Sequence, residues 1–333
     1  MNNQILLSII VPVYKVEPYI NKCLDSLIVS PDLMEKLEVI IVNDGTPDNS
    51  AEMSREYVKR YPGTFRQIDK ENGGHGSAWN VGLNEAQGKY VKFLDSDDWL
   101  TNLDRLILEV EQCDADIVFN PFIKEYVYEE KAEVVEVPSP NGNVARITAD
   151  MWGASKWGYN SVNFWSLTYK TAILEPIEPI FAEKAMFDDY ILTWTPLVHG
   201  RTYISFDFPV YHYFLGRPGQ SMAKTQQRKG AESYVKCFDQ YESVRSRVEL
   251  NKTPSDLIKC IDQSIIGYAN YIFAFMIYLP YQRSKSEMKY LWKHYLHNKP
   301  DKSRLLQRFE KLPFLVFFVV EHLRRKVILR NHV

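Results

Sequence analysis

The feature that most constrains this chain is a short apolar run that ends in three acids, residues 89–99 (KYVKFLDSDDW). The apolar residues suit a buried strand, and the acids follow where that strand would leave its sheet. In an open α/β sheet, ligands bind beyond the carboxyl ends of the strands. Asp95 and Asp97 are two residues apart, so their carboxylates can converge on Mg²⁺ or Mn²⁺, which prefer oxygen ligands. The alternative is a solvated acidic turn before a helix.

The first hundred residues alternate strand-like and helix-like segments with short connections. Predicted strands cover residues 6–13, 37–42, 65–69 and the apolar run, and predicted helices cover 17–30, 50–61 and 77–87. This alternation is typical of an α/β fold in which crossover helices flank a parallel sheet.

Three predicted loops follow strands and therefore share one rim of the sheet: residues 12–17, residues 43–45 and the acidic turn. A fourth loop, residues 71–76 (ENGGHG), opens a helix and offers backbone N–H groups that can hold phosphate, although glycine clusters also simply make turns. The sequence contains neither GxGxxG nor GxxxxGK[S/T], which disfavours a dinucleotide enzyme or a P-loop NTPase.

Composition excludes several other classes. The formal net charge is −2, so nucleic acid is not an implied partner. The four cysteines are scattered without metal-binding spacing, which suits reduced thiols in a cytosol. Residues 1–4 are polar and uncharged, so we expect no signal peptide before the first strand.

Four segments together resemble the family 2 inverting glycosyltransferases of GT-A fold. They are residues 11–17 (VPVYKVE), 41–46 (IVNDGT), 71–80 (ENGGHGSAWN) and 95–99 (DSDDW). The resemblance implies a GT-A (Rossmann-like), mostly parallel sheet flanked by helices, a nucleotide-diphospho-sugar donor that is usually UDP-linked, and Mn²⁺ or Mg²⁺ at a DXD motif. One departure is Trp79, where many relatives carry an arginine expected to contact phosphate.

The resemblance also assigns roles to the donor half. Asp44 would accept the N3 proton of the pyrimidine, Asp95 would lie near the ribose and the metal, and Asp97 would be the metal ligand. The full donor-binding set that it implies is Pro12, Val13, Tyr14, Glu17, Asp44, Asn72, Gly73, Gly76, Asp95, Ser96, Arg217 and Ser221.

The resemblance returns in two later segments, Phe187-Asp188-Asp189 and residues 209–221 (PVYHYFLGRPGQS). By similarity Asp189 would be the catalytic base, with Asp188 orienting it or an acceptor hydroxyl; the alternative is that both only cap the following helix. Arg217 and Ser221 would close over the diphosphate. His212 could complete the metal shell, or it could simply be packed.

We expect a catalytic domain over residues 1–225, with a donor half (1–100) and an acceptor half (101–225) that holds a hairpin within 124–137. Residues 226–333 should form a mostly helical region. Within it, residues 263–282 carry no charge but are too polar for a membrane span, which favours a buried helix or an oligomer face.

Near the end of the chain, the apolar residues 312–320 are too few to cross a bilayer, and Arg324, Arg325, Lys326 and Arg330 follow them. Such a segment could lie on an anionic membrane or dock as a helix on its own domain.

These features predict an inverting glycosyltransferase that moves a hexosyl or N-acetylhexosaminyl group from a UDP-sugar to a hydroxyl of a glycan or a lipid-linked acceptor. The resemblance suggests bacterial cell-envelope or exopolysaccharide assembly, in the cytoplasm or at the inner face of the membrane; a homo-oligomer stays open. The alternative is a non-catalytic GT-A scaffold or partner subunit of another glycosyltransferase, although a scaffold has no need of so complete a set of acids. A nucleotidyltransferase is disfavoured because the first loop is neither basic nor glycine-rich.

Overall fold

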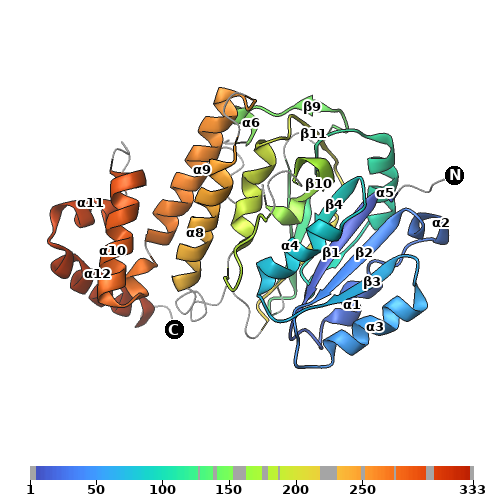
Figure 1. Cartoon of the computed structure of the whole chain (residues 1–333), viewed down its shortest axis with the longest axis horizontal. Coiled ribbons are helices and arrows are strands. Elements are labelled where there is room, and N and C mark those ends of the chain that lie inside the picture. The colour runs from blue at the N-terminus through green and yellow to red at the C-terminus, as the bar shows by residue number, and fades with distance from the viewer. Residues whose placement is uncertain are drawn as a thin grey trace.

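The structure is a computed structural model. It describes residues 5–126, 128–137, 141–152, 163–174, 179–186, 188–217, 231–248, 252–273, 275–297 and 304–330. Figure 1 shows a sheet with helices packed on it at one side of the molecule and a group of helices from the end of the chain at the other.

The central sheet has eight strands in the order β3-β2-β1-β4-β10-β6-β11-β9. Their bounds are β1 (Leu7–Val13), β2 (Leu37–Asn43), β3 (Phe65–Asp69), β4 (Tyr90–Phe93), β6 (Ile117–Phe119), β9 (Ala145–Arg146), β10 (Leu167–Lys170) and β11 (Thr202–Ser205). Strands β1 to β4 are parallel to one another, as predicted. Strand β10 then pairs antiparallel with both β4 and β6, so the second half of the sheet is mixed.

The helices of the first half are α1 (Ile20–Asp25), α2 (Pro31–Met34), α3 (Ser50–Arg60), α4 (His75–Glu85) and α5 (Leu103–Gln112). The helix predicted over residues 17–30 is much shorter, because the Glu17 N–H is held by Asp48 and residues 27 and 28 form turns with i→i−3 bonds. Helix α4 begins two residues early, since Gly74 adopts a φ of 89° and ends the loop there.

The core is built on β1 and β2, which are buried at every position. Their nearly continuous aliphatic sequences suit central parallel strands that are covered on both faces. This rigid centre fixes the ends of β1, β2 and β4, where the predicted ligand-binding loops begin.

A second sheet has four strands in the order β5-β12-β7-β8. They are β5 (Trp99–Leu100), β7 (Phe122–Tyr126), β8 (Lys131–Val135) and β12 (Tyr211–Leu215). Strands β7 and β8 form the hairpin predicted within residues 124–137, shifted towards the N-terminus. Because β12 pairs with β5, it lies beside the acidic turn that precedes β5.

Short elements lie in the connections between β9, β10 and β11 of the central sheet: α6 (Ala149–Trp152), η1 (Phe164–Ser166), η2 (Thr171–Ile173), η4 (Asp188–Thr193) and η5 (Thr195–Leu197). The helix predicted after the acid pair is the 3₁₀ helix η4, which begins at Asp188.

The last part of the chain is helical, as predicted: α8 (Ala231–Ser246), α9 (Ser255–Phe273), η6 (Met276–Tyr278), α10 (Tyr281–Leu291), η7 (Trp292–Leu296), α11 (Arg304–Lys311) and α12 (Phe314–Arg330). It packs on η4, whose Tyr190 ring stacks on Tyr268 of α9 with centroids 4.8 Å apart. Helix α9 buries Ile261, Ile265 and Ile272, which agrees with the predicted buried helix. Among the described helices, none combines the length and the apolar character that crossing a membrane requires.

Candidate active site

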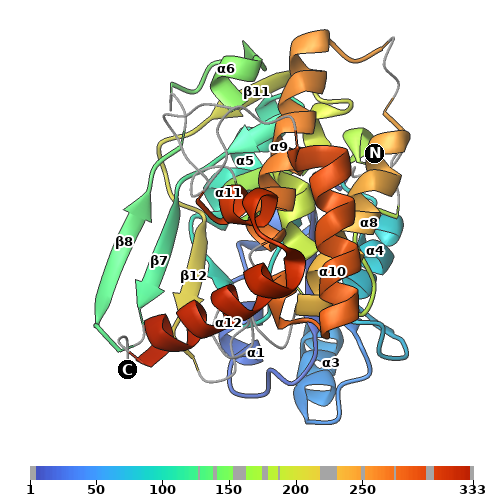
Figure 2. The same cartoon turned by 90° about the vertical axis from the view of Figure 1, so that its left-hand side faces the viewer.

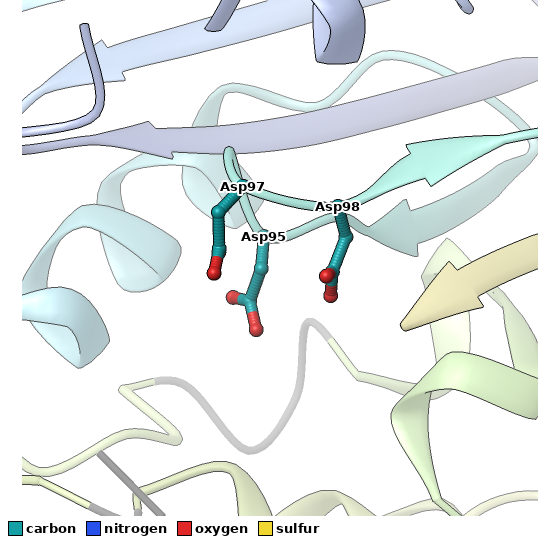
Figure 3. A group of neighbouring side chains, drawn as sticks. All are labelled: Asp95, Asp97 and Asp98. Atoms are coloured by element: carbon teal, nitrogen blue, oxygen red, sulfur yellow. The ribbon is translucent and has the colours of Figure 1, made fainter. Parts of the chain in front are cut away.

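The acidic turn follows β4 and brings three carboxylates together. Asp95, Asp97 and Asp98 each offer an oxygen, and these oxygens lie within 4.8 Å of one another. Figure 3 shows the three side chains pointing to the same side of the turn. The Asp98 N–H closes this turn by donating to the Asp95 carbonyl at 3.0 Å.

Asp98 fastens this turn to the second sheet. Its carboxylate accepts from the Tyr211 hydroxyl at 2.6 Å and from the Phe214 N–H at 2.8 Å. The same Tyr211 hydroxyl accepts from the Asp95 N–H at 3.1 Å. Burial raises the pKa of Asp98 well above its usual range, and the nearby Asp97 and Asp95 charges add to the rise. Asp98, which the sequence analysis did not assign to the site, thus leaves Asp95 and Asp97 as the more exposed acids.

Arg217 lies just after β12 and forms an ion pair with Asp97, 120 residues away in the chain. Burial and the Asp95 charge raise the pKa of Asp97, and Arg217 opposes them. The structure thus brings together two residues that the sequence analysis assigned to the diphosphate and its metal. Carboxylates this close fit a divalent ion, since Mg²⁺ is usually held by one or two carboxylates with further ligands from substrate phosphates and water.

His75 links the acidic turn to the acids of η4. Its Nε2 lies 2.9 Å from Asp95 Oδ1, and its Nδ1 lies 3.1 Å from Asp188 Oδ1. Burial lowers the pKa of His75, but Asp188 and Asp95 outweigh this effect and raise the pKa well above 6.5. Protonated, the ring donates from both nitrogens and holds both carboxylates. Sequence reasoning missed this role; the available signal was a polar ring in a glycine loop on the rim where ligands bind.

Two neighbours of His75 explain how the ring is held. A Cβ on Gly76 would collide with the Asp188 carboxylate, so only glycine lets α4 approach η4 this closely. Trp79 lies one turn further along α4, fully buried, with its ring centroid 4.0 Å from that of His75. It packs against Phe93 and Phe181. The tryptophan is therefore a core residue that supports His75.

The two acids of η4 have different environments. Asp188 is buried and pinned by His75, whereas Asp189 keeps part of its surface exposed. Burial raises the pKa of Asp189 to about 7; the Asp188 and Asp95 charges add to the rise, and His75 opposes it. A carboxyl group that titrates near neutral pH is suited to general-base catalysis.

Asp44 is almost fully buried and organises the glycine loop. Its carboxylate accepts from the Gly73 N–H at 2.8 Å, the Gly74 N–H at 2.8 Å and the Lys70 ammonium at 2.7 Å. Asn72 donates to the Asp44 carbonyl at 2.9 Å. Two of the N–H groups that could have held phosphate are therefore bound to Asp44. A carboxylate offers about four acceptor positions, so one remains for a ligand.

The other residues predicted to flank the base lie at the ends of β1 and β2. Pro12 and Val13 are buried within β1, whereas Tyr14 is 42% exposed on the rim. Glu17 accepts from the Asn49 side chain at 3.0 Å, which ties the loop after β1 to the loop after β2.

Three further assignments have different outcomes. His212 Nδ1 bonds Glu125 Oε1 at 2.8 Å, and the ring stacks on Trp99, so its role as a metal ligand stays a prediction. Ser96 is buried inside the acidic turn. Ser221 lies outside the described residues.

Both the sequence and the fold of this chain are similar to those of known proteins. Residues 8–145 match the family model described as Glycosyl transferase family 2. The chain is 45% identical over 122 residues to the uncharacterized glycosyltransferase EpsJ of Bacillus subtilis, a match that covers 36% of this chain and 35% of that protein. The chain therefore spans about a third of the length of this relative.

Two solved structures share the fold. S. aureus TarS 1-349, determined in complex with UDP-GlcNAc, matches with a TM-score of 0.53 and 18% identity, over 88% of this chain and 90% of that one. Mannosyltransferase PcManGT from Pyrobaculum calidifontis, in complex with GDP-Man and Mn²⁺, matches with a TM-score of 0.51 and 17% identity, over 95% and 84%. Residues 8–145 therefore resemble the family 2 glycosyltransferases, and the fold of the chain is the GT-A fold of these two structures.

Proposed function

We propose that this protein is an inverting glycosyltransferase that moves a sugar from a UDP-sugar to a hydroxyl of a glycan or a lipid-linked acceptor, with a divalent metal ion. The observation that carries the proposal is one connected site: Asp95 and Asp97 meet Arg217 at the end of β4, and His75 ties Asp95 to the acid pair of η4. Donor-side and acceptor-side groups therefore lie on opposite sides of one imidazole.

The donor side suits a nucleoside diphosphate. Asp95 and Asp97 would hold the metal ion, which neutralises the charge of the leaving diphosphate when it is bound. Arg217 adds planar N–H donors that match phosphate oxygens. The nucleotide sugars bound to TarS and PcManGT support this class of donor. Asp44 has one acceptor position left for the N3–H of a pyrimidine.

The acceptor side supplies the base. Inversion by direct displacement needs a carboxylate to take the proton of the acceptor hydroxyl as the bond to the sugar forms. Asp189 fits, because its pKa is raised to about 7 and its side chain is not tied to His75. Asp188 is held in place by His75 and would orient Asp189 or an acceptor hydroxyl.

The test begins with the donor. Thermal shift with nucleotide sugars, with and without Mn²⁺, should reveal the donor, since stabilisation grows with ligand concentration over the dissociation constant. Slow transfer of the sugar to water, in which the bond to the diphosphate breaks and UDP leaves, then provides an assay that needs no acceptor. We expect release to rise with pH through about 7, because Asp189 must lose its proton to act.

Asp189→Asn should keep donor binding and lower UDP release by roughly 10²–10⁴, the usual contribution of general-base catalysis. The matched control is Asp114→Asn, a 79% exposed acid that pairs with Lys89 and Lys170 away from this cluster. Full activity of Asp189→Asn would exclude Asp189 as the base. Donor binding without turnover in any metal would favour the non-catalytic scaffold.

A further inference from the structure

Helix α12 is fixed to its own domain by one face. Phe317 is fully buried, with its ring centroid 5.2 Å from Phe309 of α11 and 6.5 Å from Phe273 of α9. One turn later, Glu321 is buried in an ion pair with Arg308. These contacts set the rotation of α12 about its axis, so its opposite face is also fixed.

That opposite face is apolar and exposed. Leu315 is 59% exposed, Val316 45%, Val319 46% and Leu323 59%. At 3.6 residues per turn these four positions fall within an arc of about 100°. We call this set the α12 face. The first seven residues of α12 are all apolar, and a helix that is apolar all round is normally covered on every side.

Its surroundings are basic. Residues 304–330, which form α11 and α12 with the turn between them, contain seven Lys and Arg and two acids, a net charge of +5, whereas the whole chain carries −2. One of the two acids is Glu321, which is already paired. The basic residues Arg324, Arg325 and Lys326 come directly after Leu323. Figure 2 shows α12 at the front of the molecule when the helical end faces the viewer.

An apolar face within a basic segment distinguishes between two partners that could cover the α12 face. A second copy of the chain docked symmetrically through the α12 face would bring two segments of charge +5 together, which repel each other. An anionic lipid surface offers both a hydrocarbon boundary for the apolar face and negative charge for the basic residues.

We propose that the α12 face binds an anionic membrane surface, with Leu315, Val316, Val319 and Leu323 inserted at the boundary between headgroups and acyl chains. The helix lies along the surface, and the net positive charge of the segment attracts the anionic headgroups. The proposal stands independently of the transferase activity.

The test is co-sedimentation of the full chain with vesicles of phosphatidylcholine containing phosphatidylglycerol, compared with phosphatidylcholine alone. The chain should bind the anionic vesicles, and added salt should weaken the binding because it screens the basic residues. The double variant Leu315→Glu/Val319→Glu should lower the partition coefficient by at least about tenfold, since each apolar side chain withdrawn from water contributes about that factor.

The matched control is Leu108→Glu, since Leu108 is 49% exposed on α5, outside the helical region. It should bind vesicles like the parent. If the double variant misfolds by circular dichroism, Arg324→Glu provides a second test, because it leaves every apolar contact in place and should also weaken binding. The proposal is overturned if the parent does not bind anionic vesicles, if these variants bind as well as the parent, or if sedimentation velocity without lipid shows an oligomer that the α12 variants dissociate.

Discussion

Lys92 lies in the middle of β4 and is fully buried. Its ammonium donates to the carbonyl oxygens of Trp165 at 3.1 Å and Leu167 at 3.0 Å. Burial lowers its pKa from 10.5 to about 7. A lysine with this pKa makes the stability of the fold depend on pH in a way that can be calculated.

A fall of the lysine pKa from 10.5 to about 7 corresponds to about 5 kcal/mol. Below pH 7 both the folded and the unfolded chain carry the proton, so stability does not change with pH through this group. Between pH 7 and 10.5 the unfolded chain binds a proton that the folded chain has released, so stability rises with pH by up to about 1.4 kcal/mol per unit. Half of the folded molecules already lack the proton at pH 7, so the expected gain from pH 7 to 9 is about 2 kcal/mol.

Lys92→Met keeps the length of the side chain and removes the titration. Urea unfolding of the parent and the variant at pH 7 and 9 should therefore show that the parent gains about 2 kcal/mol relative to the variant. The difference at a single pH is less informative, because the variant also deprives two carbonyl groups of a donor, which costs about 1–3 kcal/mol each.

The matched control is Lys59→Met, since the Lys59 side chain is 62% exposed. It stays protonated in both states and should show no such change. An equal difference between Lys92→Met and the parent at both pH values would refute the argument, because it would mean that Lys92 keeps its proton in the folded chain.

Three further predictions concern the site. Asp97→Asn should abolish most metal-dependent UDP release with little change in the unfolding midpoint, and full activity in Mn²⁺ would contradict its role. Asp44→Ala should weaken UDP binding measured by calorimetry; unchanged affinity, or tighter binding of a purine nucleotide, would show that the base pocket lies elsewhere. His75→Gln, measured with a chelator present, should lower the free energy of unfolding by about 2 kcal/mol at pH 6, because the buried Asp188 loses its charged partner. The raised pKa of His75 makes its contribution complete below about pH 6.5 and diminishing as pH rises through the folded pKa, so an equal loss at pH 6 and 9 would argue against a protonated ring.

The sequence predicts the parallel strands of the first hundred residues well because the signals for them are local. Apolar runs form β1, β2 and β4. Strand β2 ends at Asn43, the first residue of the predicted turn Asn43-Asp44-Gly45. The rule that loops after parallel strands share one rim then brings Asp44 and Asp95 to the same edge. Where spacing alone was used, the prediction failed: an apolar period over residues 17–30 also fits a short helix followed by turns.

The partners that compensate a buried charge cannot be predicted from the residues next to it in the sequence. Lys92 interrupts an apolar run, and its partners are two carbonyl groups more than seventy residues away. Asp98 received no role from the sequence, and its pairing with Tyr211 makes it structural. Which acid stays open to a ligand depends on where β12 lies, and strand pairing between distant segments sets that position.

The role of His75 was the hardest to predict from the sequence, because the two carboxylates that it contacts come from different kinds of segment. Asp95 ends a strand of the parallel sheet and is placed on the rim by that fact. Asp188 begins a 3₁₀ helix, and nothing in strand alternation places η4 against α4; the contact joins residues 113 apart. The local trace of this contact is Gly76, which sequence analysis interpreted as part of a phosphate loop. Asp44 already binds the Gly73 and Gly74 amides, and Gly76 is the glycine whose missing side chain lets Asp188 of η4 come within reach of the imidazole.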